Sequence, residues 1–132
     1  EIQALVVKSS TPQPRRVTNG VDSSRVAMLL AVLERRAGIS LSDKDVYVST
    51  VGGMKIIEPA ADLAIAIAIA SAVSDKPVAK SVAAFGEISL SGEIRGVSNP
   101  AQRSNEATRL GHKAIVDSSS GQLKVALAKA LG

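Results

Sequence analysis

Residues 51–73, VGGMKIIEPAADLAIAIAIASAV, place a glycine turn and a proline ahead of a long apolar run. Within the run, Ile65, Ile67 and Ile69 alternate with alanine, which formally favours a strand. The length, the alanine content and the position of Pro59 favour a helix, because alanine is the best helix former and proline suits a first turn. Asp62 near that end agrees with a helix. We therefore predict a fully buried helix.

This apolar run cannot cross a membrane as a helix. The segment from Leu63 to Val73 is far shorter than the roughly 20 residues that a transmembrane helix needs. It is therefore interpreted as a core element, and no membrane partner is expected.

The composition is that of one globular domain spanning residues 1–132. Of the 132 residues, 45% are hydrophobic and 21% are charged, and the single Phe, single Tyr and absent Trp require an aliphatic core. The absence of cysteine excludes disulfides, thiolate zinc sites and cysteine nucleophiles. The chain opens on a strand pattern without a signal peptide, so we expect a cytoplasmic domain cut from a longer protein.

The remaining patterns predict strands and helices that interleave without a regular βαβ rhythm. Strands are expected at 2–7, 15–19, 45–50, 113–117 and, as a strand, bend and strand that turns at Ser91-Gly92, across 81–97. Helices are expected from Asp22 or Ser23 to Gly38, from Asn99-Pro100 to Gly111, and over 121–131 with Leu123, Leu127 and Leu131 on one face. The fold class is therefore α+β, with mixed sheets packed against about four helices.

Several blocks carry a resemblance to a known family. RRVTNG, LLAVLERRAGISL, DVYVSTVGGMKIIEPAADLAIAIAIASA, FGEISLSGEIRGV and EATRLGHKAIV, in this order, resemble the C-terminal domain of the RadA (Sms) family of bacterial DNA repair proteins. That domain is similar to the proteolytic domain of Lon. In Lon-type peptidases a Pro-Ser-Ala-Gly loop presents the nucleophilic serine, and a lysine on a later segment activates it.

The resemblance implies that this chain lacks the peptidase dyad. Pro59-Ala60-Ala61-Asp62 occupies the serine loop, so Ala60 takes the nucleophile's position, and Ala101 falls near the lysine's position. A methyl group cannot attack a carbonyl, and no amine is present to activate a hydroxyl. The implied domain is therefore not an enzyme.

Other chemistry finds little support in the residues. His112 is the only histidine, with Asp117 as the nearest candidate partner, and a surface loop histidine is the stronger interpretation than a catalytic one. One histidine and scattered carboxylates form no metal-ligand cluster. No phosphate-binding loop is present, and the resemblance implies that ATP, magnesium and zinc belong to a RecA-like ATPase domain and a zinc finger outside this chain.

Two functional hypotheses remain open beside a remote residual serine hydrolase. The resemblance implies a scaffold that assembles as a homo-hexamer for an ATP-dependent branch-migration motor, working with a RecA-type recombinase. The net charge of +4 and the basic residues Arg15, Arg16, Arg25 and Lys55 suggest sequence-neutral contact with single-stranded or branched DNA, with Arg95 and Arg103 as further DNA or interface candidates. The alternatives are that these basic residues are ordinary solvent-exposed loop charges and that the domain is purely structural.

Overall fold

The N-terminal half of the protein is built on a three-stranded sheet. The computed structural model describes residues 1–79, 82–97, 100–112 and 114–131. Strands β1 (Ile2–Lys8), β2 (Arg16–Asn19) and β3 (Lys44–Thr50) form the sheet in the order β1-β3-β2. The central strand β3 pairs antiparallel with β1 and parallel with β2.

The register of this sheet separates an inner face from an outer face. Val46 and Val48 of β3 point inward and are buried, because successive side chains alternate between the faces of a strand. On the outer face, Leu5 and Val17 both pair with Tyr47, so these three side chains form one row across the sheet.

Helix α1 (Ser23–Ala37) forms as predicted, and its caps explain its bounds. The Asp22 carboxylate accepts a hydrogen bond from the Ser24 N–H at 3.2 Å, so Asp22 rather than Ser23 is the N-cap. Gly38 ends the helix in the left-handed conformation, with φ of 70°. The buried positions Leu29 and Leu33 face the core.

The ambiguous apolar run is a helix, which confirms the prediction. A short 3₁₀ turn, η2 (Pro59–Ala61), leads directly into α2 (Asp62–Ser74). Asp62, Leu63, Ile65 and Ile69 are buried, whereas Ala64, Ala68 and Ala72 are only half-buried. The alternation of isoleucine with alanine fits a helix because almost every side of α2 is covered.

Shorter elements complete the C-terminal half. Strand β4 (Val82–Ala84) pairs in parallel with β7 (Ala114–Val116), and β5 (Glu87–Ile88) pairs antiparallel with β6 (Ile94–Arg95). Helix α3 (Pro100–Arg109) precedes β7, and α4 (Leu123–Leu131) is the last element. The 3₁₀ turn η3 (Ser118–Ser120) lies between β7 and α4, and another, η1 (Val51–Gly53), directly follows β3. The predicted boundaries at Ser81, Asn99 and Lys113 lie outside the described residues.

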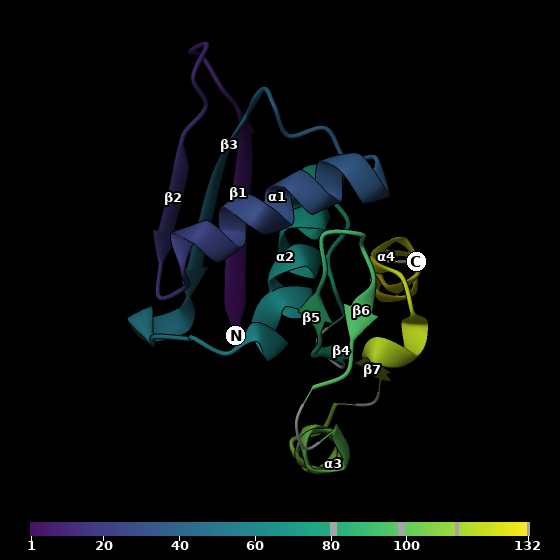
Figure 1. Ribbon diagram of the computed structural model, residues 1–132. Helices are drawn as coiled ribbons and strands as arrows, with labels where there is room; N and C mark the ends of the chain where they lie inside the picture. Colours follow the sequence, from purple (N-terminus) through teal and green to yellow (C-terminus); the bar gives the residue numbers. More distant parts are fainter. Residues whose placement is uncertain (80–81, 98–99, 113, 132) are drawn as a thin grey trace.

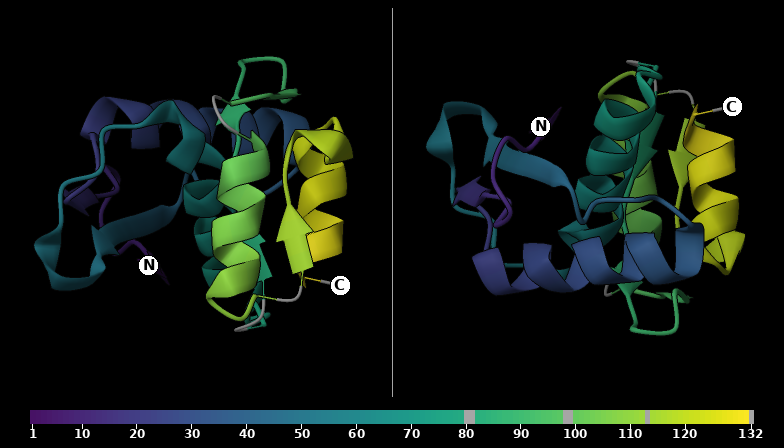
Figure 2. Two further views of the ribbon diagram at one scale, coloured as in Figure 1. Left: turned by 90° about the horizontal axis from the view of Figure 1, so that it is seen from below. Right: turned by 90° about the horizontal axis from the view of Figure 1, so that it is seen from above.

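The core lies where α1 and α2 pack against each other, against the three-stranded sheet and against α4. Helix α1 crosses the inner face of the sheet and continues past α2 toward α4 (Figures 1 and 2). Leu33, Leu63 and Leu123, one from each of α1, α2 and α4, are at most 1% exposed. Helix α3 stands away from this core in Figure 1, and Ala107 is its one buried residue among those described.

The described part of the chain contains small mixed sheets and four α-helices. This architecture confirms the predicted α+β fold class. On α4, Leu123 and Leu127 are buried as predicted, while Leu131 is half-buried. Across the described ranges no helix is long and apolar enough to cross a membrane.

Gly20 is expected to be the glycine most sensitive to substitution. Its φ is 84°, and a Cβ there would overlap the Thr50 hydroxyl and lie 2.6 Å from the Met54 carbonyl oxygen. Gly20→Ala should therefore lower the free energy of unfolding by about 3 kcal/mol, measured by urea denaturation. Gly38→Ala is the control, because nothing lies within 4 Å of its added Cβ, and it should lose only about 1 kcal/mol. Equal losses would contradict the steric explanation.

Candidate functional site

The turn before α2 is held by backbone hydrogen bonds to the segment between β4 and β5. The Gly86 N–H donates to the Ala60 carbonyl at 2.8 Å, and the Leu63 N–H donates to the Gly86 carbonyl at 3.0 Å. Ala60, which the resemblance aligns with a Lon-type nucleophile, is 7% exposed. Its side chain offers only a methyl group to any substrate.

An ion pair with a buried carboxylate lies directly beside this turn. Arg25 in the first turns of α1 reaches Asp62 at the start of α2 with both arms of its guanidinium: Nε donates to Oδ1 at 3.2 Å, and Nη2 forms a second, close contact with Oδ2. The Ile88 N–H of β5 also donates to Oδ2, at 3.1 Å. The Asp62 carboxylate at the start of α2 accepts hydrogen bonds from Arg25 of α1 and from the Ile88 N–H of β5. It therefore links the three elements.

Burial dominates the electrostatics of Asp62. The side chain is about 2% exposed, and this burial raises the pKa of the Asp62 carboxyl above its ordinary value. The hydrogen bonds from Arg25 and from the Ile88 N–H lower the pKa, but they offset the burial only in part. Arg25 is thus the group that makes a charged Asp62 tolerable at this position.

The position that the resemblance aligns with the Lon-type lysine lies on α3. Ala101 is exposed in the first turn of α3. Arg103, two residues later, forms an ion pair with Glu58 at 3.0 Å, and Glu58 precedes Ala60 by two residues. This pair tethers the segment of Ala101 to the segment of Ala60, so the two positions that the resemblance aligned come from segments in contact.

The structure does not gather the predicted DNA-binding arginines into one cluster. The Arg16 guanidinium donates to the carbonyls of Leu41, at 2.9 Å, and Lys44, so it braces the loop before β3. Arg25 is bound to Asp62 near the opposite end of β2, as described above. Arg15 is exposed, and its guanidinium has no side-chain partner within the described residues.

Lys55 and Arg25 line the same hollow, of about 530 Å³, between the start of α1 and the loop that follows η1. Three carboxylates, Asp22, Glu58 and Asp62, line it as well. The hollow therefore mixes both signs of charge and is poorly suited to a phosphate backbone. Lys55 itself is exposed.

The remaining candidates lie apart from this hollow. Arg95 is exposed on β6. Asp117 accepts hydrogen bonds from the Ser119 N–H and hydroxyl at 3.0 and 2.6 Å, which caps η3. The His112 Nδ1 is buried without a hydrogen-bond partner among the described residues, so the structure records no pairing of His112 with Asp117. The described ranges contain no group of three or more potential metal ligands.

Comparison with known proteins establishes the family. Residues 22–120 match the family model described as subunit ChlI of Mg-chelatase. The chain belongs to this ChlI family. It is also 48% identical over 116 residues to DNA repair protein RadA of Rickettsia felis, and 47% and 46% identical over 116 residues to those of Bacillus subtilis and Salmonella typhimurium.

The alignments with the Rickettsia felis and Bacillus subtilis proteins each cover 88% of this chain, but only 26% and 25%, respectively, of those relatives. The chain thus spans about a quarter of the length of the RadA proteins that it matches. The predicted homology to RadA is confirmed. The part of the chain that matches the ChlI family model is the domain described above.

Sequence reasoning missed the structural role of Asp62 in this ChlI-type domain. It treated Asp62 as a favourable charge at a helix start and Arg25 as a DNA contact. A signal was present: an acid that opens a fully buried apolar run must find a partner, because an unpaired buried charge is very costly. The identity of that partner depended on the packing of α1 against α2.

Replacing Arg25 should destabilise the fold in a pH-dependent way. Arg25→Met leaves the buried Asp62 carboxylate without its cation, and we expect the free energy of unfolding at pH 7 to fall by roughly 2–3 kcal/mol. The substitution also removes a pKa-lowering group, so the folded-state pKa of Asp62 rises further above its unfolded value. Stability from such a group is present at acid pH and is lost as pH rises through the folded-state pKa.

Chemical denaturation between pH 4 and pH 7 measures this effect. The stability difference between wild type and Arg25→Met should widen as pH rises. Glu106→Gln, which removes the exposed Arg109 pair, is the control and should change stability little at either pH. A difference that stays constant with pH would show that Asp62 is not the titrating group.

Proposed function

We propose that this ChlI-type domain is a non-proteolytic scaffold and auxiliary DNA-binding surface in a longer recombinational repair protein. The similarity to DNA repair protein RadA, which extends over most of the chain, carries this proposal. Under this proposal, copies of the domain assemble as a hexamer within the longer protein. The hexamer holds an ATP-dependent branch-migration motor, which works with a RecA-type recombinase. ATP, magnesium and zinc bind to other parts of that longer protein.

Burial of Ala60 supports the absence of peptidase chemistry. The two segments that would supply a nucleophile and its activating amine carry alanine at both positions, and the backbone of the first is engaged by Gly86. Without a hydroxyl and an amine, the turn has no group that can form an acyl intermediate.

Serine-directed labelling tests this part of the proposal. Neither the wild-type protein nor Ala60→Ser should react stoichiometrically with a fluorophosphonate probe, as measured by mass spectrometry, because the activating lysine is absent in both. Chymotrypsin-like proteases label under the same conditions and serve as the positive control. Stoichiometric labelling of the wild type would overturn the non-enzymatic assignment, and peptide cleavage by Ala60→Ser would contradict the alignment of Ala101 with the lysine.

Arg15 and Lys55 are the side chains that best support DNA contact. Both are exposed, whereas the Arg16 and Arg25 guanidinium groups are engaged within the fold. Arg103 is paired with Glu58, and Arg95 stays an exposed, secondary candidate. With one Phe and one Tyr in the chain, base stacking contributes little, so binding is directed at the phosphate backbone.

Fluorescence anisotropy with labelled single-stranded and forked DNA across a salt series tests this contact. For single strands, the log–log salt slope should be about −0.7 per phosphate neutralised, and Arg15→Ala/Lys55→Ala should make it shallower. Lys124→Ala, an exposed lysine on α4, is the matched control and should retain the wild-type slope. Absence of binding at low salt would remove DNA contact and leave the purely structural scaffold.

A further inference from the structure

Three exposed apolar side chains lie on the segment between β3 and α2, which extends beyond the ends of β2 and β3 (Figure 1). Val51, Met54 and Ile57, together called the apolar tip, are 47%, 70% and 82% exposed. Lys55, which stands between them in the chain, is also exposed. Single apolar residues on a surface need no explanation, but a group of them in one short segment indicates a contact with another molecule.

The apolar tip is presented by a fixed backbone. Gly52, with φ of 73°, turns the chain after β3. Beyond this turn, the Thr50 hydroxyl donates to the Met54 carbonyl at 2.5 Å, and the Ile56 N–H donates to the Gly20 carbonyl at 2.7 Å. Because these contacts already order the segment, little conformational entropy remains to be lost when it binds a ligand.

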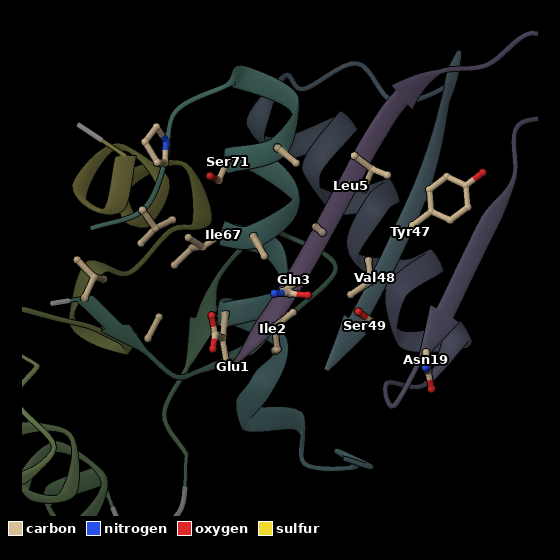
Figure 3. A pocket seen from close by; sticks show the side chains of 18 of the residues that line it. Glu1, Ile2, Gln3, Leu5, Asn19, Tyr47, Val48, Ser49, Ile67 and Ser71 are labelled. Carbon is tan, nitrogen blue, oxygen red and sulfur yellow. The ribbon is translucent and has the colours of Figure 1, made fainter. Parts of the chain in front are cut away.

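The apolar tip is too small to be one side of a protein interface. Each partner in a standard interface contributes roughly 20–30 residues, whereas the tip has three apolar ones. A surface of protein size lies elsewhere: the groove beside β1, of about 1350 Å³, is lined from β1, β3 and α2, and Figure 3 shows its side chains. None of the tip residues is in its described lining. The tip is therefore better suited to a narrow gap than to a broad face.

The charges around the apolar tip leave Lys55 available for a phosphate. The neighbouring hollow mixes both signs of charge, but two of its carboxylates, Glu58 and Asp62, are each paired with an arginine. A third, Asp22, accepts the capping hydrogen bond of α1. Lys55 forms no ion pair within the described residues. Its ammonium can therefore bind a phosphate oxygen at the rim of the hollow, next to the tip.

Aliphatic side chains can bind between the bases of a nucleic acid. Inserted isoleucine, methionine and similar side chains unstack a base step, which costs free energy. That cost is smallest where the bases are already unpaired, as in a single strand or at the branch point of a fork. An apolar tip would therefore discriminate branched DNA from continuous duplex, and it needs none of the aromatic rings that are scarce in this chain.

We propose that Met54 and Ile57 contact unstacked bases at the branch point of DNA, while Lys55 binds a phosphate beside them. This base contact rests on the DNA contact proposed above and adds what that contact leaves open, the structure of the DNA. The ligand is DNA whose bases are already unpaired, because there the tip enters without breaking a duplex. The similarity to DNA repair protein RadA supports DNA as the polyanion.

Forked DNA with 2-aminopurine in the base pair beside the branch point tests the base contact. The emission of 2-aminopurine rises when the base is unstacked, so binding of the wild-type chain should raise it. Anisotropy should show tighter binding to the fork than to a duplex of the same length. Met54→Ser/Ile57→Ser should abolish the rise in emission and weaken binding to the fork about tenfold, as loss of one buried aliphatic side chain does.

Matched variants separate the apolar contact from the charge. The serine variant should retain the wild-type affinity for the duplex and the wild-type salt slope, because Lys55 is unchanged. Lys55→Ala should weaken binding to fork and duplex alike and retain the rise in emission at saturation. Leu90→Ser, at a residue 70% exposed on the β5–β6 turn, should behave like wild type. Circular dichroism checks that each variant folds, and Ile57→Ser alone replaces the double variant if that one does not.

The outcomes distinguish the base contact from the DNA contact on which it rests. Binding to both DNAs without a rise in emission, or a fork preference that survives the serine substitutions, would overturn the base contact alone. An equal loss in Leu90→Ser would show a non-specific apolar effect and overturn it as well. Absence of binding to either DNA at low salt would overturn the DNA contact itself and leave the apolar tip to a protein partner.

Discussion

The packing of this domain depends on one carboxylate that three elements share. Asp62 binds the Arg25 guanidinium of α1 and the Ile88 N–H of β5 from its place at the start of α2. Because α2 is apolar almost throughout, its sides specify no unique orientation, and a directional polar contact at one end supplies that specificity. The ion pair thus fixes how α2 enters the core, and with it the position of the turn at Ala60.

The same arrangement gives a physical account of the turn that the resemblance aligns with a peptidase loop. The turn is kept in place by Gly86 and by the Asp62 contacts, so its geometry persists although Ala60 presents only a methyl group. A loop of this kind serves the architecture, which agrees with the scaffold that we propose for the longer protein.

The surface divides into regions of different chemistry. Near the start of β2, Arg15 is the exposed charge while Arg16 braces a loop. The hollow lined by α2 and β1, which also reaches Val17 and Asn19 of β2, has no lysine or arginine in its described lining.

Local sequence signals determined the secondary structure because the causes were local: Asp22 and Gly38 as helix caps, alternating apolar residues in β1 and β3, and alanine content that favours a helix over 62–74. Multi-residue blocks in a fixed order also led to the RadA resemblance without any structure. The pairing of Arg25 with Asp62, the inward use of Arg16 and the groove beside β1 were decided only by tertiary structure. These contacts join residues 25 or more positions apart, and a side chain's partner over such distances depends on how whole elements pack, which no local pattern encodes.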